Sequence, residues 1–339
     1  MTAGTFLRIT GIATCGLIAI WGGLALWYRI PRGRLAKMSC VLAWAAFSVA
    51  AMALARERFG PGLCAFAAGF AALLLWWSRL RATNDADWTD DVARMTCGSV
   101  DGTRVTLHNV RNFDWRSAID YTPRWETRTY DLDRLRSVDM IMSYWRGPAI
   151  AHMLISFGFE GGAHVVFSVE VRRRRTQQFS EVGGFFKEFE LSVIAAEELD
   201  VVRLRTNVRG ERVYLYRLLL EAPAMRSLFL GYLDEANRLI DAPRFYNTIT
   251  VNCTTLVYQM MRRIVGRLPV RYELLLSGYM PDYVYRVGGL DRRYSLDELR
   301  ARGLISDRAR AADRSADFSL DIRRGIPQTE HHDTHEGGG

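Results

Sequence analysis

The sequence predicts an α+β domain that follows three membrane-spanning helices. Three apolar runs fill the first quarter of the chain, β-type runs follow between residues 103 and 172, and an amphipathic helix begins at Asn252-Cys253. The length of 339 residues leaves room for one or two domains with a proper core. We therefore expect membrane helices in residues 1–81, one α+β domain in 82–305, and a polar, partly disordered tail in 306–339.

The apolar runs cover roughly residues 9–27, 38–55 and 62–77. Each approaches the ~20 residues needed to cross a bilayer. Short charged turns separate them, and aromatic pairs stand where the membrane interfaces should be, at Trp27-Tyr28 and Trp76-Trp77. A cleaved signal peptide would not be followed by two more such runs, so we expect retained helices.

The charges of the loops weakly predict the orientation. The first loop carries four cations, against one in the N-terminus and two in the second loop: Arg29, Arg32, Arg34 and Lys37, then Arg8, then Arg56 and Arg58. Counted simply, the positive-inside rule puts the first loop, and with three spans also the α+β domain, in the cytoplasm. The margin is about one charge and the rule is weaker when a long domain follows, so the count leaves the orientation undecided.

Strand patterns occupy residues 103–110, 138–145, 153–159, 164–172 and 212–218, after a linker at 83–88. The turn Gly161-Gly162 predicts a hairpin between the third and fourth of these strands. Helical spacing is found in residues 223–240 and 296–302, whereas 185–198 fits either a helix or a strand. This mixture predicts a mixed or antiparallel sheet packed against the helix that starts at Cys253.

Composition excludes some classes of function. The net charge is +8, but the arginines are scattered among acidic residues, and the densest cluster, Arg172–Arg175, fits a solvated strand end or a lipid headgroup contact better than a nucleic-acid groove. Cys15, Cys40 and Cys64 lie in apolar runs, which leaves Cys97 and Cys253 and no disulfide framework. We expect neither nucleic acid nor a cofactor as a partner. We expect no metal site, although His331, His332 and His335 allow a weak one in the tail.

Cys253 is the best candidate for a reactive group. It is predicted in the first turn of its helix, where free N–H groups and the helix dipole lower a cysteine pKa from its usual ~8.5. The same N–H groups can stabilise an oxyanion. The alternative is a small hydrophobe packed at a helix start.

A nucleophilic cysteine needs a base, and His152 is the better candidate among His108, His152 and His164. Folding the hairpin about Gly161-Gly162 brings Glu170 within one register step of His152, where it could orient the imidazole. The alternatives are a satisfied histidine at a strand end and a surface carboxylate that pairs with Arg172. The histidine precedes the cysteine, in the order that a circular permutation of a papain-like site gives.

Several stretches carry a resemblance to a known family, and they run across most of residues 84–265. They are Asn84-Asp85-Ala86-Asp87-Trp88, His108-Asn109-Val110-Arg111-Asn112-Phe113, Asp120-Tyr121-Thr122-Pro123-Arg124, Ser143-Tyr144-Trp145, 151–159, Arg205-Thr206-Asn207, 213–217 and 246–255. The chain resembles the Lnb-type N-terminal periplasmic domain family, named for a bacterial lipoprotein N-acyltransferase, and more distantly the permuted papain-like fold of NlpC-type peptidases.

The resemblance implies Cys253 as nucleophile, His152 as base and Glu170 as a third catalytic residue. It also implies a multi-pass anchor in the bacterial inner membrane, with the domain in the periplasm. Candidate substrate-binding residues are Asn252, Thr254, Tyr144 and Trp145, with Arg111, Arg124 and Arg205 as further candidates for a cleft. The alternatives for the aromatic and basic residues among them are core packing and surface pairing.

The function expected from these residues is thiol-dependent acyl transfer or hydrolysis on a lipid-linked or lipoprotein ester or amide. Its expected partners are the bilayer and lipoproteins or phospholipids. An alternative enzymatic function is a cell-wall amidase or peptidase that uses the same Cys-His dyad. The non-enzymatic alternative is a membrane-tethered binding module that does not turn over a substrate.

Overall fold

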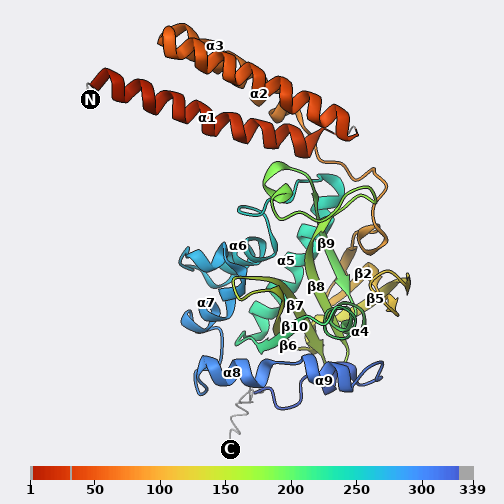
Figure 1. Cartoon of the computed structure of the whole chain (residues 1–339). Coiled ribbons are helices and arrows are strands. Elements are labelled where there is room, and N and C mark those ends of the chain that lie inside the picture. Colours follow the sequence, from red (N-terminus) through yellow and green to blue (C-terminus); the bar gives the residue numbers. More distant parts are fainter. Residues whose placement is uncertain (1–2, 31–32, 328–339) are drawn as a thin grey trace, which may run out of the picture. The chain divides into compact units, whose positions relative to one another are not determined.

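The computed structural model describes residues 3–30 and 33–327, which fold into two compact units (Figure 1). One unit holds residues 1–83 together with Phe179–Glu190. The other holds residues 84–178 and the chain from Leu191 onward. The stretch Phe179–Glu190 thus groups with the N-terminal helices, although the sequence placed it inside the α+β domain.

The first unit contains three helices that are long and apolar enough to cross a membrane, as predicted: α1 (Ala3–Arg29), α2 (Arg34–Glu57) and α3 (Phe59–Arg79). Helix α2 packs on α1, where Trp44 Nε1 donates to the Ala19 carbonyl at 2.8 Å. It meets α3 so closely at Gly62 that an added Cβ would lie 2.1 Å from the backbone nitrogen of Ala55. Only glycine fits this contact.

The second unit is built on an eight-stranded mixed sheet in the order β1-β2-β9-β8-β7-β6-β10, with β5 paired to β2. Strand β2 pairs parallel to β9 and antiparallel to β1 and β5. The strands are β1 (Cys97–Asp101), β2 (Arg104–Arg111), β5 (Trp125–Asp131), β6 (Leu135–Arg146), β7 (Ile150–Phe159), β8 (His164–Arg172), β9 (Glu190–Ala196) and β10 (Arg212–Arg217). The short strands β3 (Asp114–Trp115) and β4 (Tyr121–Thr122) form a separate ribbon. This arrangement confirms the predicted α+β class with a mixed sheet.

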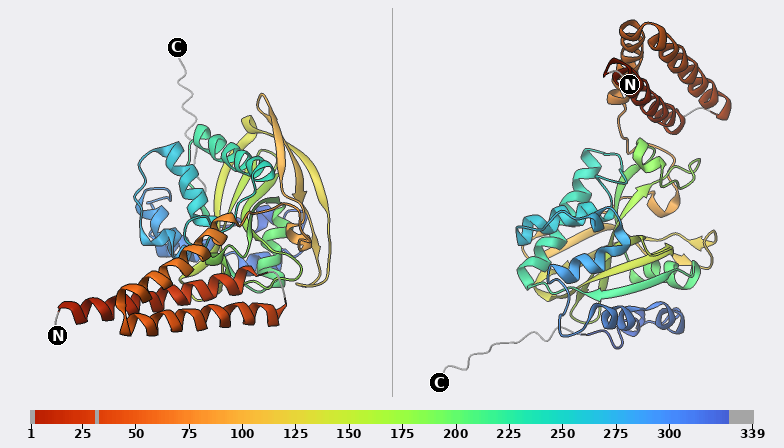
Figure 2. Two further views of the ribbon diagram at one scale, coloured as in Figure 1. Left: turned by 90° about the horizontal axis from the view of Figure 1, so that it is seen from above. Right: turned by 60° about the vertical axis from the view of Figure 1, so that its left-hand side comes forward.

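Helices cover both faces of the sheet (Figure 2). Because side chains alternate along a strand, Met140 faces one core and Ile141 the other. The Met140 core includes α5 (Ala222–Asp241), α6 (Cys253–Val265) and α7 (Met280–Arg286). The Ile141 core includes α4 (Glu198–Arg203), α9 (Ser306–Ala311) and α10 (Phe318–Asp321). Helix α8 (Leu296–Gly303) leads from the first group to the second.

The predicted hairpin is present between β7 and β8. Leu154 pairs with Ser168 and Phe157 with Val165. Gly161 and Gly162 close the turn with φ of +82° and +85°, which glycine adopts without strain.

The segment that begins at residue 306 differs from the expected polar tail as far as residue 327. It contains α9 and α10, and Ile322 and Arg323 are buried. The Arg323 guanidinium is bonded to the carboxylates of Asp139 and Glu198, so a residue that looks solvent-seeking in the sequence is held inside. The histidines expected as a weak metal site lie outside the described residues.

Candidate functional site

Asn252 is the N-cap of α6, and both polar atoms of its side chain bond backbone groups. Its Oδ1 accepts from the backbone N–H groups of Thr254 (2.9 Å) and Thr255 (2.8 Å), and Thr255 Oγ1 accepts in return from the Asn252 N–H. Asn252 Nδ2 donates to the Thr248 carbonyl at 2.6 Å. This capping box fixes the start of the helix, and with it the position of Cys253. The structure therefore places Asn252 as a cap whose side chain is engaged, rather than free toward a substrate.

Cys253 is the first residue of α6 and is buried. Its Sγ lies 3.8 Å from Thr254 Oγ1, and it interacts with the His152 imidazole and with the backbone of Met153. Burial alone would raise the pKa of the thiol, but the hydrogen bond and the charge of His152 outweigh it and lower the pKa. His152 thus makes the Cys253 thiol more acidic than burial alone would.

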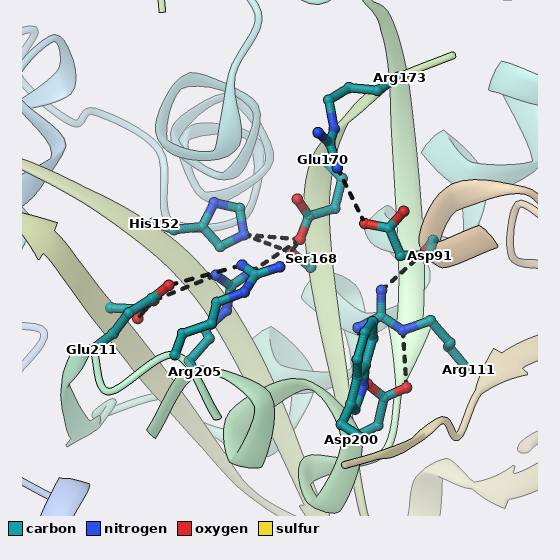
Figure 3. Close-up of polar contacts among 12 residues, drawn as sticks. Asp91, Arg111, His152, Ser168, Glu170, Arg173, Asp200, Arg205 and Glu211 are labelled. Carbon is teal, nitrogen blue, oxygen red and sulfur yellow. Dashed lines mark hydrogen bonds and ion pairs between the residues drawn. The ribbon is translucent and has the colours of Figure 1, made fainter. Parts of the chain in front are cut away.

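His152 lies near the start of β7 and is almost buried, with 14% of its side chain exposed. Its Nε2 is 2.7 Å from Ser168 Oγ and 3.2 Å from Glu170 Oε1 (Figure 3). The other ring nitrogen points away from Glu170 (Figure 3), and the imidazole also interacts with the Cys253 thiol. Burial disfavours the imidazolium, but the Glu170 charge outweighs burial and raises the pKa of His152 to about 9.

Glu170 stands where the hairpin register predicts it. Leu154 pairs with Ser168 in the antiparallel register. Continuing that register by two residues places His152 opposite Glu170. Glu170 Oε1 accepts from Ser168 Oγ at 2.6 Å and from Arg205 at 3.2 Å. Burial raises the pKa of this carboxyl, but His152 outweighs burial and, with Arg205 and Ser168, brings the pKa well below its ordinary value. Glu170 is therefore a buried, ionised partner of His152 and not a surface carboxylate.

Arg205 completes the electrostatics of the site. It lies in a single π-helical turn, Leu204–Val208, that continues α4, and it also faces Glu211 at 3.7 Å. Glu211 in turn accepts a hydrogen bond from Ser143, the residue paired with His152 on β6. The chain Ser143–Glu211–Arg205–Glu170–His152 thus connects β6, the stretch 205–211, β8 and β7 around the imidazole. Figure 3 shows its part from Glu211 to His152.

The other predicted cleft residues have different places. Arg111 is buried in a two-pronged pair with Asp200, at 2.9 and 3.0 Å, and its role is structural. Tyr144 donates to the Gly278 carbonyl at 2.6 Å, and burial raises its pKa to about 12. Trp145 is exposed and Thr254 is buried, while Arg124 pairs with Glu126.

His164 is not brought to the cysteine. It sits at the hairpin turn, where Nδ1 contacts the Gly162 carbonyl at 2.8 Å and burial lowers its pKa. The two hairpin histidines therefore lie at opposite ends of the hairpin, and of the two it is His152 that interacts with Cys253.

Two residues of the site were not singled out from the sequence. Ser168 bonds both His152 and Glu170, and its position two residues before Glu170 on one strand was the available signal. Tyr246 is the second. Burial raises the pKa of Tyr246, and the charges of Cys253 and Glu170 raise it further, which places its hydroxyl in the field of both groups. Among the described residues, no group of three or more His, Cys, Asp or Glu could hold a metal ion.

The comparison with protein families identifies this domain. Residues 121–284 match the model of the Lnb N-terminal periplasmic domain, a range that includes His152, Glu170 and Cys253. No curated protein and no solved structure matches the chain. With three candidate spans ahead of the match, the chain is an inner-membrane protein with a periplasmic domain. The loop charges leaned toward the cytoplasm by a margin too small to decide the orientation, and the positive-inside rule loses force when a long domain follows the spans.

Proposed function

We propose that this inner-membrane protein, whose residues 121–284 are an Lnb N-terminal periplasmic domain, is a cysteine-dependent acyltransferase or hydrolase. The observation that carries the proposal is the pairing of Cys253, at the start of α6, with a histidine whose pKa is raised to about 9. A thiol of lowered pKa beside an imidazole of raised pKa favours a thiolate–imidazolium pair near neutral pH.

The first step follows from that pair. The Cys253 thiolate attacks the carbonyl carbon of an ester or amide, forming a C–S bond and an oxyanion. As the C–O or C–N bond breaks, the leaving group takes the proton of the His152 imidazolium. Glu170 remains ionised and holds the ring in place through Nε2. An acyl-enzyme remains, and its acyl group passes to an amine or to water.

The oxyanion needs a hydrogen-bond donor beside Cys253. The cap uses the N–H groups of Thr254 and Thr255, so we assign this role to the backbone N–H of Cys253 itself.

The membrane helices favour a lipid-linked substrate. A protein held to the bilayer by three helices meets phospholipids and lipoproteins at high local concentration, and such substrates leave the bilayer only at a large cost in free energy. The His-before-Cys order also fits a permuted papain-like site, in which a cell-wall amidase would use the same two residues.

Trapping the acyl-enzyme tests the chemistry. The purified full-length protein is incubated with phospholipid vesicles, with phospholipid plus a lyso-lipoprotein, or with muropeptides, and its intact mass is measured. We expect a gain of one acyl chain with phospholipid, located on Cys253 and removed by hydroxylamine. A change of muropeptide mass instead would identify the amidase.

Matched variants separate enzyme from binding module. Cys253→Ala should abolish the adduct and any product, whereas Cys97→Ala, which changes the other cysteine of the domain, should keep both. A Cys253→Ala protein that retains full biological activity in cells would show a binding module and overturn the proposed chemistry.

A further inference from the structure

Residues 179–190 connect β8 to β9 but pack on the membrane helices. Phe186 stacks on Tyr28 of α1, with ring centroids 5.6 Å apart. Arg29, the last residue of α1, donates to the Lys187 carbonyl at 2.8 Å, and Lys187 Nζ donates to the Trp77 carbonyl of α3 at 2.9 Å. The segment is thus fixed to the C-terminal ends of α1 and α3.

Those helix ends lie at the periplasmic side of the bilayer. Helix α3 is the last span before the periplasmic domain, so its C-terminal end faces the periplasm. Aromatic residues mark the same level. The rings of Trp21 in α1 and Trp77 in α3 have centroids 5.3 Å apart, and Trp76 packs beside Trp77. Tryptophan and tyrosine gather where the hydrocarbon core meets the headgroups, so residues 179–190 lie at that interface.

The segment exposes large apolar side chains at this level. Phe179, Val182 and Phe185 are 51%, 46% and 39% exposed. Phe186 is buried against Trp21 and Tyr28 of α1, and Phe189 is buried with one face stacked on Phe179, at 6.4 Å between ring centroids. Phe179, Val182 and Phe185 nevertheless leave a large part of their apolar surface exposed. In water this exposed surface would cost free energy, whereas in the interfacial region of a bilayer it is stabilised.

Arg29, Lys37 and Arg81 surround the segment, which itself carries Lys187 and three glutamates, Glu181, Glu188 and the buried Glu190. Burial lowers the pKa of Lys187, and the positive charges of Arg29 and Arg81 lower it further. Lys37 and Arg29 act on Glu188, the carboxylate next in the chain. Such a cluster at a membrane surface is complementary to the phosphates of anionic phospholipids.

We propose that residues 179–190 are an interfacial membrane-binding segment that inserts Phe179, Val182 and Phe185 into the periplasmic leaflet. The cations Arg29, Arg81 and Lys187 lie at the depth of the anionic headgroups. Residues 179–190, which follow the three membrane helices by about a hundred residues, then form an additional contact with the bilayer. This inference depends on the membrane orientation and not on the proposed chemistry of Cys253.

Spin labels measure the depth of the segment directly. In the full-length chain with all five cysteines changed to alanine, single cysteines are introduced as Val182→Cys or Phe185→Cys, labelled with a nitroxide and reconstituted in phosphatidylethanolamine–phosphatidylglycerol bilayers. Relaxation by oxygen, which enters the bilayer, is compared with relaxation by a water-soluble nickel chelate.

Two positions provide the reference values. Leu17→Cys lies on the exposed side of α1 within the span, and Ile119→Cys lies on the second unit with 92% exposure. We expect labels at 182 and 185 to be relaxed by oxygen more than by nickel, as at 17. Labels at 182 and 185 that behave as at 119 would overturn the proposal.

A second measurement does not depend on the cysteine-free background. A photo-crosslinking phenylalanine analogue replaces Phe185 in the otherwise natural chain, and its products are identified by mass spectrometry. Cross-links to phospholipid support the insertion, whereas cross-links only to protein overturn it. Bilayers without phosphatidylglycerol should reduce the lipid cross-links if the cations bind anionic headgroups; an unchanged yield would overturn that part.

Discussion

At the scale of single residues, the state of Cys253 depends on a charge that it does not touch. Glu170 raises the pKa of His152, and His152 lowers the pKa of Cys253. The raised pKa means that the His152–Glu170 pair is fully formed below the ordinary histidine pKa of about 6.5. The pair and its contribution to stability are lost as the pH rises through about 9.

Glu170→Gln should therefore raise the pH at which Cys253 becomes reactive. Without the carboxylate, His152 loses its proton at lower pH, and the thiolate loses its counter-charge. We expect the midpoint of Cys253 alkylation by iodoacetamide to move upward by about one pH unit or more. The measurement uses the full chain with the other four cysteines changed to alanine.

Glu211→Gln is the matched control, because Glu211 contacts Arg205 and Ser143 and not His152. Its alkylation midpoint should stay close to that of the parent chain. If Glu170→Gln also left the midpoint in place, the carboxylate would have no part in setting the thiol pKa.

At the scale of elements, local signals were the ones that could be predicted. The Gly161-Gly162 turn and the apolar face of α6 are short-range patterns, and from them followed the hairpin register and the positions of His152, Glu170 and Cys253. Strand β9 gave no such signal. All seven of its residues are buried, so the alternation that marks a strand is missing.

Long-range partners explain what the sequence could not predict. Arg205 reaches Glu170 only because a π-helical turn positions it, and nothing in the spacing of the two residues indicates that contact. Residues 306–327 looked like a tail because they are rich in charge. Their Arg323 is neutralised by Asp139 and Glu198, which are far away in the sequence.

Arg323→Ala should strongly destabilise the domain. The guanidinium bonds Asp139 at 2.9 Å and Glu198 at 2.6 and 2.7 Å, and all three residues are buried. Removing it leaves Glu198 as an unpaired buried charge, while Asp139 keeps Arg217. We expect a loss of about 3 kcal/mol in the free energy of unfolding, measured by chemical denaturation of the full chain in detergent.

Arg324→Ala provides the comparison at the next residue. Arg324 has 79% of its side chain exposed and pairs only with Asp321 in the same turn, so we expect a change within about 0.5 kcal/mol. Equal effects of the two substitutions would contradict the view that the Arg323 pairs hold residues 306–327 in the fold.

At the scale of the whole molecule, the orientation in the membrane was predicted by family resemblance and not by charge. A periplasmic domain after three spans requires a cytoplasmic N-terminus, a periplasmic first loop and a cytoplasmic second loop. The cations Arg29 and Lys37 of the first loop then lie outside, where Arg29 bonds the Lys187 carbonyl and both act on Glu188. Local partners thus account for cations that the charge rule would assign to the cytoplasm.

Accessibility of the two loops tests this topology. Gly33→Cys and Gly60→Cys are suitable because both positions are exposed and an added Cβ meets no atom within 4 Å. In the cysteine-free chain, a membrane-impermeant maleimide added to intact spheroplasts should label residue 33 at once and residue 60 only after the membrane is permeabilised. Because the two substitutions are alike and neither changes a charge, the opposite pattern would place the domain in the cytoplasm.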